Sequence, residues 1–482
     1  MMYNGLIQRV AIPFAFLVGF AATASAQAVS GSVTCNGKGV ANVVVTDGKY
    51  FAQTDSKGRY ALPDNDDAQW VYLSVPSGYS APADGSITRF YQPITRGAKR
   101  KYAFELSQTP GGDSKHRFLH FSDIQIKQQK EADQLVNFVA DAQQTIAATP
   151  KGTSVFGVDC GDIVGDNHAM YEQYLKHVNE LRIPVARAIG NHDMDYWGGT
   201  HESSYRTFEK LFGPTVYSFN RGEAHYIIVN DVYFVGRDYF YIGNLTDKTL
   251  RWIEKDLAFV KKGSPVFVAM HIPSTLTEGT APFEYSFKIA ETASNAKALH
   301  QLLKPFNAHI LSGHTHYNKN MVLSDSLYEH NVGATSGAWW QGDACTDGTP
   351  MGYGVYDVNG TTVTWSFKTI GKPQSYQFRA YPVGYTPDQP GCIVANVWNW
   401  DKSWKVEWYE DGVLRGEMER YDGKDPYVNE IYSDKSKLEY KWIYPSVTNH
   451  LFRAKPTKEG ATVEVVATDR FGNVYRQTVG KR

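Results

Sequence analysis

Cysteine is scarce in this sequence. The 482 residues contain four cysteines, Cys35, Cys160, Cys345 and Cys392, which are too few for a disulfide framework. Cys160 is expected to be a small buried residue, and the sequence leaves open whether Cys345 and Cys392 pair. An excess of either charge is also missing, because 49 Lys and Arg stand against 50 Asp and Glu, a net charge of −1. This balance, without a basic run, gives no indication of specific nucleic-acid binding.

Long apolar runs are absent apart from one near the N-terminus. Residues 10–24 are apolar, follow Arg9 and lead into Ala24-Ser25-Ala26. A basic start, a short apolar core and an A-x-A end are typical of a cleavable secretory signal. Spanning a bilayer takes about 20 residues, and no charged stop-transfer cluster follows. We therefore expect a signal peptide at residues 1–26, no transmembrane segment after its cleavage, and a secreted protein, periplasmic or extracellular.

The rest of the chain is too long for one core, and three regions are expected. Residues 27–109 contain short β-rich runs separated by turn signals, which predict an all-β sandwich. Residues 115–370 alternate short apolar runs with amphipathic helical stripes, a pattern typical of an α/β domain. Residues 373–482 return to β character and are rich in tryptophan and tyrosine, so a second all-β sandwich is expected.

Polar residues follow five of the apolar runs in the middle region. The carboxyl ends of strands border the ligand crevice of an α/β sheet, so these segments are expected to converge. Their carboxylate, imidazole and amide groups suit borderline metals such as Zn, Mn or Fe. Each segment alone is ordinary turn chemistry, but the set together favours a metal site. The segments are Asp123, Gly161-Asp162, Gly190-Asn191-His192-Asp193, His271 and Gly313-His314-Thr315-His316.

In their order and strand-end placement these segments resemble the five sequence blocks of the calcineurin-like metallophosphoesterases, over roughly residues 117–370. The flanking modules resemble those of secreted three-domain bacterial members. The N-terminal one is similar to prealbumin-like modules through Thr54-Asp55-Ser56-Lys57-Gly58-Arg59-Tyr60. The resemblance implies an α/β fold, a four-layer α/β/β/α metallophosphoesterase sandwich, flanked by two all-β sandwich modules.

The resemblance also implies roles for individual residues at a pair of divalent or trivalent metal ions. Asp162 would bridge both ions, and a hydroxide between them would attack the phosphorus. His192 would contact the phosphate and assist the leaving group. The first ion would be held by Asp123, Gln125 and His316, and the second by Asn191, His271 and His314.

Two positions depart from the family pattern. The common first block is Asp-x-His, but Gln125 stands where the His is expected and is a weaker, neutral donor. Gly165 occupies a position where many relatives have an Asp, and the acid falls at Asp166 instead. We expect Asp166, Asn167 and Asp193 to orient the ligands. Trp339 and Trp340 are expected either to wall the cleft or to pack against a β module.

The predicted function is metal-dependent hydrolysis of phosphomonoesters or phosphodiesters at a dinuclear centre of Mn, Zn or Fe. The alternative is a non-catalytic secreted binding protein that keeps a weakened, structural metal site. Gln125 is the one motif feature that favours this alternative. The substrate, the oligomeric state and the role of the β modules stay open, because loops and appended domains determine them.

Overall fold

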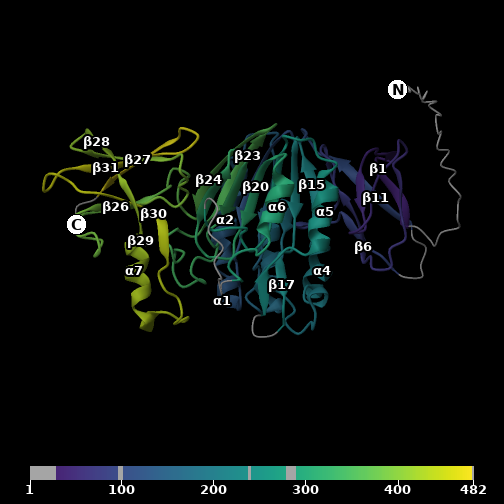
Figure 1. Cartoon of the computed structure of the whole chain (residues 1–482), viewed down its shortest axis with the longest axis horizontal. Coiled ribbons are helices and arrows are strands. Elements are labelled where there is room, and N and C mark those ends of the chain that lie inside the picture. Colours follow the sequence, from purple (N-terminus) through teal and green to yellow (C-terminus); the bar gives the residue numbers. More distant parts are fainter. Residues whose placement is uncertain (1–28, 96–100, 237–239, 278–288, 480–482) are drawn as a thin grey trace, which may run out of the picture.

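The computed structural model describes residues 29–95, 101–236, 240–277 and 289–479, which form three units along the long axis (Figure 1). A β-rich N-terminal unit lies at one end, an α/β unit lies in the middle, and a β-rich C-terminal unit lies at the other end. The predicted signal peptide, residues 1–26, lies outside the described residues. Among the helices that the structure describes, none has the length and apolar character needed to cross a membrane.

Two mixed sheets form the centre of the middle unit. The first has the order β14-β13-β12-β23-β24, and the second has the order β15-β16-β19-β20-β22-β21. Within each sheet, the strands that precede the predicted site segments run parallel. The first sheet consists of β12 (Lys115–Phe121), β13 (Ser154–Asp159), β14 (Val185–Arg187), β23 (Gly352–Asn359) and β24 (Thr362–Thr369). The second consists of β15 (Tyr217–Arg221), β16 (Ala224–Ile228), β19 (Pro265–Ala269), β20 (Asn307–Ser312), β21 (Lys319–Ser324) and β22 (Leu327–Asn331).

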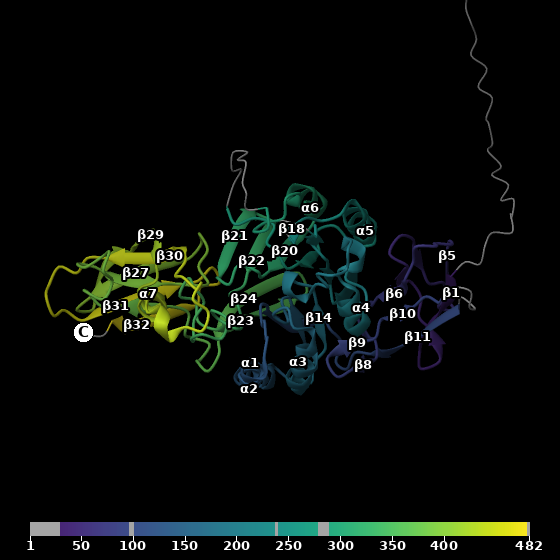
Figure 2. The same cartoon turned by 90° about the horizontal axis from the view of Figure 1, so that it is seen from below.

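Helices cover the outer face of each sheet, which completes a four-layer α/β/β/α sandwich (Figure 2). The stripe of α2 shows why it packs there: Leu135, Phe138, Val139 and Ala142 recur at helical spacing and are all buried. The first sheet is covered by α1 (Gln129–Ala132), α2 (Leu135–Ala147) and α3 (Tyr171–Val178), and the second by α5 (Asp247–Leu257) and α6 (Ala296–Leu303). Between them in sequence lie α4 (Arg206–Phe212) and the short hairpin of β17 (Val232–Phe234) and β18 (Tyr241–Gly243).

The N-terminal unit consists of two facing sheets. It packs on the middle unit through Arg187, whose guanidinium donates to the Ser86 hydroxyl at 2.6 Å, and through the bridge between Val75 and Phe219. One sheet contains β1 (Val29–Cys35), β2 (Lys38–Gly39), β5 (Arg59–Leu62), β7 (Tyr79–Ser80) and β11 (Lys101–Gln108). The other contains β3 (Val44–Thr46), β4 (Phe51–Gln53), β6 (Trp70–Ser74) and β10 (Tyr91–Pro93), while β8 (Ala83–Asp84) and β9 (Ile87–Thr88) pair separately.

The C-terminal unit has two four-stranded sheets and one helix that the sequence analysis did not predict. The helix is α7 (Pro426–Ser433), and its N-cap Asp425 accepts a hydrogen bond from the Val428 backbone at 3.1 Å. An Asp N-cap followed by Pro at the first helical position is a helix-start signal that the β-rich surroundings obscured. The strands are β25 (Arg379–Tyr381), β26 (Ile393–Asn396), β29 (Glu419–Lys424) and β30 (Val447–Ala454) in one sheet, and β27 (Lys405–Glu410), β28 (Val413–Glu417), β31 (Val463–Thr468) and β32 (Val474–Val479) in the other. Cys345 and Cys392, whose pairing the sequence left open, are both free thiols.

Aromatic rings fill the space between the two central sheets. Phe118 of β12 is fully buried, and four other rings surround it. Their centroids lie 4.6 Å (Tyr356), 5.1 Å (Phe267), 5.5 Å (Phe156) and 5.6 Å (Tyr226) from its own. Dense packing of this kind tolerates little loss of volume.

We predict that Phe118→Ala lowers the free energy of unfolding by about 3–5 kcal/mol, because it removes a buried ring and leaves a cavity. Guanidinium unfolding followed by tryptophan fluorescence measures the change. Phe259→Ala is the control, since this ring is 43% exposed, and it should shift the unfolding free energy by less than about 1 kcal/mol. Equal effects of the two substitutions would contradict the inter-sheet core.

Candidate metal centre

The five predicted site segments start where their strands end, at one edge of the two sheets. In the first sheet, Phe121 at the end of β12 pairs with Asp159 at the end of β13. In the second sheet, Ala269 at the end of β19 pairs with Leu311 near the end of β20. The aligned registers bring the following turns to the same level, so residues from both sheets meet between them.

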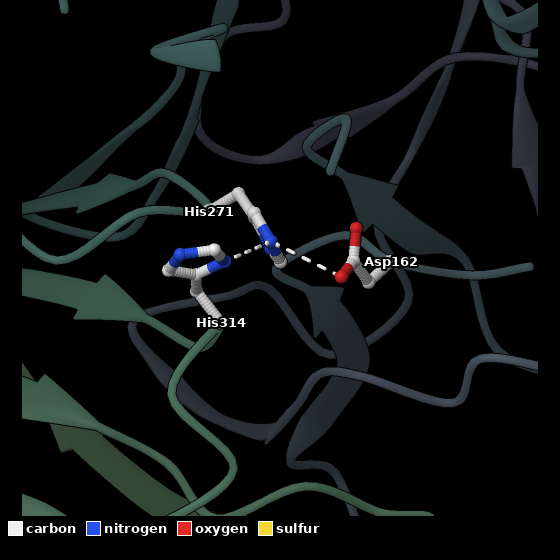
Figure 3. Close-up of side chains that lie close together, drawn as sticks. All are labelled: Asp162, His271 and His314. Carbon is white, nitrogen blue, oxygen red and sulfur yellow. Dashed lines mark hydrogen bonds and ion pairs between the residues drawn. The ribbon is translucent and has the colours of Figure 1, made fainter. Parts of the chain in front are cut away.

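Three of the predicted ligands form a tight group. One ligand atom from each of Asp162, His271 and His314 lies within 4.8 Å of the others, and Figure 3 shows His271 between the other two. His314 Nδ1 lies 3.1 Å from His271 Nε2, which lies 3.4 Å from Asp162 Oδ2. The Asn191 side-chain oxygen is 3.0 Å from the same His271 nitrogen. These four residues can hold one cation.

A second group also contacts Asp162. The Gln125 amide donates to Asp162 Oδ2 at 2.7 Å, and His316 Nε2 lies 3.4 Å from Asp123 Oδ1. Asp162 Oδ2 therefore contacts one member of each group, as a shared carboxylate would. Its other oxygen, Oδ1, accepts a hydrogen bond from the His192 backbone at 2.8 Å, which fixes the orientation of the carboxylate.

Buried ligand atoms of the second group have no hydrogen-bond partner among the described residues. They are Asp123 Oδ1, Gln125 Oε1 and His316 Nε2. Leaving a buried polar atom unsatisfied costs about 1–3 kcal/mol, and more for a charged group. A cation coordinated by these atoms would remove that cost, so the donor set fits a metal ion although one of its members is a neutral amide. The Gln125 side-chain oxygen is buried and free to act as a ligand, while its amide nitrogen donates to Asp162.

The backbone around the ligands is strained. The structure describes twelve non-glycine residues with left-handed φ, and five of them are predicted ligands: Asp123 (55°), Gln125 (45°), Asp162 (54°), His314 (72°) and His316 (56°). Each such residue costs on the order of 1–3 kcal/mol unless its surroundings enforce it. The strain is concentrated where the side chains must turn back toward a common point, which is typical of functional sites.

Two glycines let the ligand turns approach one another. A Cβ on Gly313 would lie 2.0 Å from the Ser122 hydroxyl and 2.4 Å from Asp123 Oδ2. A Cβ on Gly190 would lie 2.1 Å from the Asp162 backbone nitrogen. Because no side chain fits at either position, the turns approach closely, and the His314 backbone donates to Asp123 Oδ2 at 2.8 Å.

His192 lies at the mouth of the centre and is paired with Asp166. Its Nδ1 is 2.7 Å from Asp166 Oδ1, so the acid that falls one position late in the motif still orients the imidazole. Burial lowers the pKa of His192, but the charges of Asp162 and Asp166 outweigh burial and the pKa is raised. Paired with Asp166, the His192 imidazole is suited to hold a proton beside the centre.

The other residues expected to orient the ligands act on the backbone. Asp193 is buried and accepts hydrogen bonds from the backbones of Ile163, Val164 and Gly190, which joins the Asp162 turn to the Asn191 turn. Asn167 donates to the Lys127 carbonyl at 2.8 Å, so it anchors the segment that follows Gln125 rather than a ligand side chain.

The two tryptophans occupy different environments. Trp340 is buried and its indole donates to the Ile124 carbonyl at 2.9 Å, so it packs behind the first ligand turn. Trp339 stacks on His316 with ring centroids 4.1 Å apart and contacts Trp442 of the C-terminal unit at 4.3 Å. The sequence left two alternatives open, that these residues wall the cleft or that they pack against a β module. Trp339 contacts both the predicted ligand His316 and Trp442 of the C-terminal unit.

Sequence reasoning missed a carboxylate behind His271. Asp231 is fully buried and accepts hydrogen bonds from the His271 and Ile272 backbones, at 3.0 and 3.1 Å. Burial raises its pKa to about 7. Asp231 follows the apolar run of β16 as the other site residues follow theirs, so the same pattern could have identified it. The Cys160 carbonyl lies 2.8 Å from His271 Nδ1 and orients the ring so that Nε2 points to the centre. No feature of the sequence indicates this contact.

The carboxylates at the centre favour a positive charge at His271, whereas burial and His271 lower the pKa of His314 to about 4. Burial alone lowers the pKa of His271, but the nearby carboxylates, Asp162 foremost, raise it to about 10. The same negative potential that stabilises an imidazolium would stabilise a bound cation, which is a stronger and more compact charge.

Comparison with known proteins identifies one family over most of the chain. The family model of the calcineurin-like phosphoesterase domain matches residues 116–318. Models of the N-terminal and C-terminal domains of calcineurin-like phosphoesterases match residues 27–109 and 329–475. A comparison with curated proteins found no match.

Several solved structures are similar to this chain at low identity. A purple acid phosphatase, PPD1 from seeds of yellow lupin (Lupinus luteus), is 13% identical with a TM-score of 0.39, over 69% of this chain and 68% of that chain. A 5′-nucleotidase from Candida albicans is 13% identical with a TM-score of 0.31, over 52% and 50%. GAP50, the anchor in the inner membrane complex of Plasmodium, is 13% identical with a TM-score of 0.36, over 54% and 85%.

We predict that the protein, equilibrated with excess Mn²⁺ and then desalted, retains about two ions per chain, as a paired site does. His271→Ala should retain about one, because Asp162, Asn191 and His314 alone offer one group too few. Elemental analysis by mass spectrometry measures the stoichiometry. His177→Ala, on α3, is the control and should match the wild type. Retention of two ions by His271→Ala would show that the ligand group is wrong.

Proposed function

The chain belongs to the calcineurin-like phosphoesterase family and is a phosphoesterase hydrolase, and on that premise we propose that it hydrolyses phosphomonoesters or phosphodiesters at a pair of metal ions. One observation carries the two-ion proposal. Asp162 Oδ2 contacts one member of each ligand group, His271 at 3.4 Å and Gln125 at 2.7 Å. A single shared carboxylate between two donor sets is the arrangement that holds two cations close together.

The proposed ligand sets follow from the contacts. Asp123, Gln125, Asp162 and His316 would hold the first ion, and Asp162, Asn191, His271 and His314 would hold the second. When bound, the two ions supply the Lewis acidity that stabilises charge developing on the phosphoryl oxygens. Oxygen and nitrogen donors of this kind suit Mn, Zn or Fe.

His192 is proposed to donate a proton to the leaving oxygen. Asp166 holds its Nδ1 at 2.7 Å, which leaves Nε2 as the atom available to a substrate. A positioned imidazole accelerates such a step about 10²–10⁴-fold, and most strongly when the leaving group is a poor one. Asp166 acts as a positioning residue, because it orients the imidazole and stabilises its charge.

The alternative of a non-catalytic binding protein rested on Gln125 alone. The family assignment and the completeness of both ligand groups favour the enzyme. The proposal includes secretion, to the periplasm or the outside of the cell, which is supported by the basic, apolar and A-x-A pattern of residues 1–26.

We predict that the metal-loaded protein hydrolyses p-nitrophenyl phosphate or bis(p-nitrophenyl) phosphate, and that Asp162→Asn lowers kcat at least about 10³-fold, because several kcal/mol of charge stabilisation depend on both ions. Release of p-nitrophenol measures the rate. The absence of turnover with Mn, Zn, Fe, Ni and Co would refute the proposed function, and so would unchanged turnover in Asp162→Asn.

We predict that His192→Gln slows alkyl phosphoesters about 10²-fold or more but slows p-nitrophenyl esters much less, because p-nitrophenolate leaves without a proton. Rates of phosphate release from matched alkyl and aryl esters give the comparison. Asp166→Asn should show the same selective loss in milder form. If both ester types lose the same factor, His192 binds the phosphate and does not act as the acid.

A further inference from the structure

A row of aromatic rings leads from the metal centre onto the C-terminal unit. Trp339 stacks on the ligand His316 at 4.1 Å, and Trp442 meets Trp339 edge to face at 4.3 Å. Tyr440 stacks on Trp442, with ring centroids 5.6 Å apart and ring planes 24° apart. We call Trp339, Tyr440 and Trp442 the aromatic wall. Two of its three rings come from the C-terminal unit, so this unit reaches the edge of the centre.

The segment that carries Tyr440 and Trp442 is firmly seated on the middle unit. The Tyr440 hydroxyl donates to Glu131 at 2.9 Å, and the Glu439 backbone donates to the Gln341 side chain at 2.7 Å. Leu438 and Ile443 flank the exposed residues and are buried in a cluster that joins Ala338 and Ala344 of the middle unit to α7. These contacts fix the position of Tyr440 and Trp442 relative to the middle unit.

The wall nevertheless exposes a large apolar surface. Trp442 is 51% exposed although both of its neighbours in the wall are in contact with it. A tryptophan held half open beside a reactive centre is typical of a ligand contact, because burying it elsewhere would stabilise the fold. Trp442 is linked to the ligand His316 through Trp339, so the organic part of a substrate that extends from the metal centre past Trp339 would meet the exposed ring.

The polar groups of the segment are already paired within the protein. Glu439 bonds Lys130 and Gln128, and the Tyr440 hydroxyl bonds Glu131. With Glu439 and the Tyr440 hydroxyl paired, the exposed part of the wall is mainly the Trp442 ring, which suits a flat aromatic ligand. Lys127 joins the wall to the catalytic pair, since its Nζ lies 5.6 Å from the Tyr440 ring centre and 3.9 Å from Asp166 Oδ2. Its positive charge suits an anionic ester.

We propose that the aromatic wall binds the organic group of the substrate by ring stacking, and that the enzyme prefers phosphoesters that carry a flat aromatic ring, with nucleotides as the substrate class. This inference rests on the proposed function, because the wall recognises what the metal centre hydrolyses. Stacking of a base on an aromatic side chain is sequence-tolerant, so the wall selects for a base and discriminates weakly among bases.

Adenosine 5′-monophosphate and ribose 5-phosphate test the wall, because they share the phosphate and the sugar and differ in the base. Each is measured as a competitor of p-nitrophenyl ester hydrolysis by the metal-loaded full chain. We expect the nucleotide to bind about 5- to 20-fold more tightly in the wild type. Trp442→Leu should bring this ratio close to one, and Trp442→Phe, which keeps a flat ring, should preserve most of it.

Phe259→Leu is the matched control, since it removes an exposed ring from the end of α5 in the second sheet's helical layer and should leave the ratio unchanged. Circular dichroism checks that the variants are folded, which is expected because Trp442 is half exposed. Equal binding of the two ligands by the wild type would overturn the proposal and indicate recognition of the sugar or phosphate alone. An unchanged ratio in Trp442→Leu would overturn it as well.

Failure of the proposed function is distinguishable from failure of the wall. If the wild type hydrolyses no phosphoester with any metal, the proposed function fails, and calorimetric titration of the metal-loaded protein with the same two ligands still tests stacking. If the wild type hydrolyses phosphoesters but binds adenosine 5′-monophosphate no more tightly than ribose 5-phosphate, the proposed function stands and the wall has no role in substrate selection.

Discussion

The structure depends on one constraint. Buried oxygen and nitrogen atoms that can act as metal ligands converge between the sheets, and a bound cation would give the unpartnered ones a partner. Two carboxylates, three imidazoles and two amides converge between the sheets, and Asp123, Gln125 and His316 each bring an atom without a hydrogen-bond partner among the described residues. The same turns hold left-handed backbone at five ligand positions. The fold therefore carries both desolvation and strain at the centre, and metal binding would offset the desolvation.

The surrounding architecture explains how that cost is sustained. The inter-sheet aromatic core around Phe118 aligns the strands, and the matched registers bring their ends to one level. Gly190 and Gly313 let the turns pack without side chains between them. The C-terminal unit adds a further support, because Asn318, two residues after His316, donates to the Trp398 carbonyl of that unit at 2.6 Å. The appended unit is thus part of the centre's scaffold as well as one wall of its mouth.

Much of the centre was predictable from the sequence because strand ends are marked twice, by an apolar run and by the polar residues that follow. This pattern predicted that the Asp162 and His314 turns follow strands, while the four layers were implied by the family resemblance. It left open whether Asp166 orients His192, because the chain bends in a left-handed conformation at Asp166 that spacing does not encode. Helix α7 was missed although Asp425 and Pro426 mark its start. Trp442 was not identified as the residue that contacts Trp339, since residues about a hundred positions apart leave no local periodicity. Gln125 suggested a weaker site, and in the structure its side-chain oxygen is buried without a hydrogen-bond partner among the described residues, while its amide donates to Asp162.

The most direct test of the shared-carboxylate arrangement is a crystal structure of the Mn²⁺-loaded protein with anomalous scattering data. The arrangement predicts two anomalous peaks about 3.5–4 Å apart, with Asp162 between them and the Gln125 side-chain oxygen coordinating the ion nearer Asp123. A single peak beside His271, with Gln125 still bonded to Asp162 and Asp123 left uncoordinated, would contradict it.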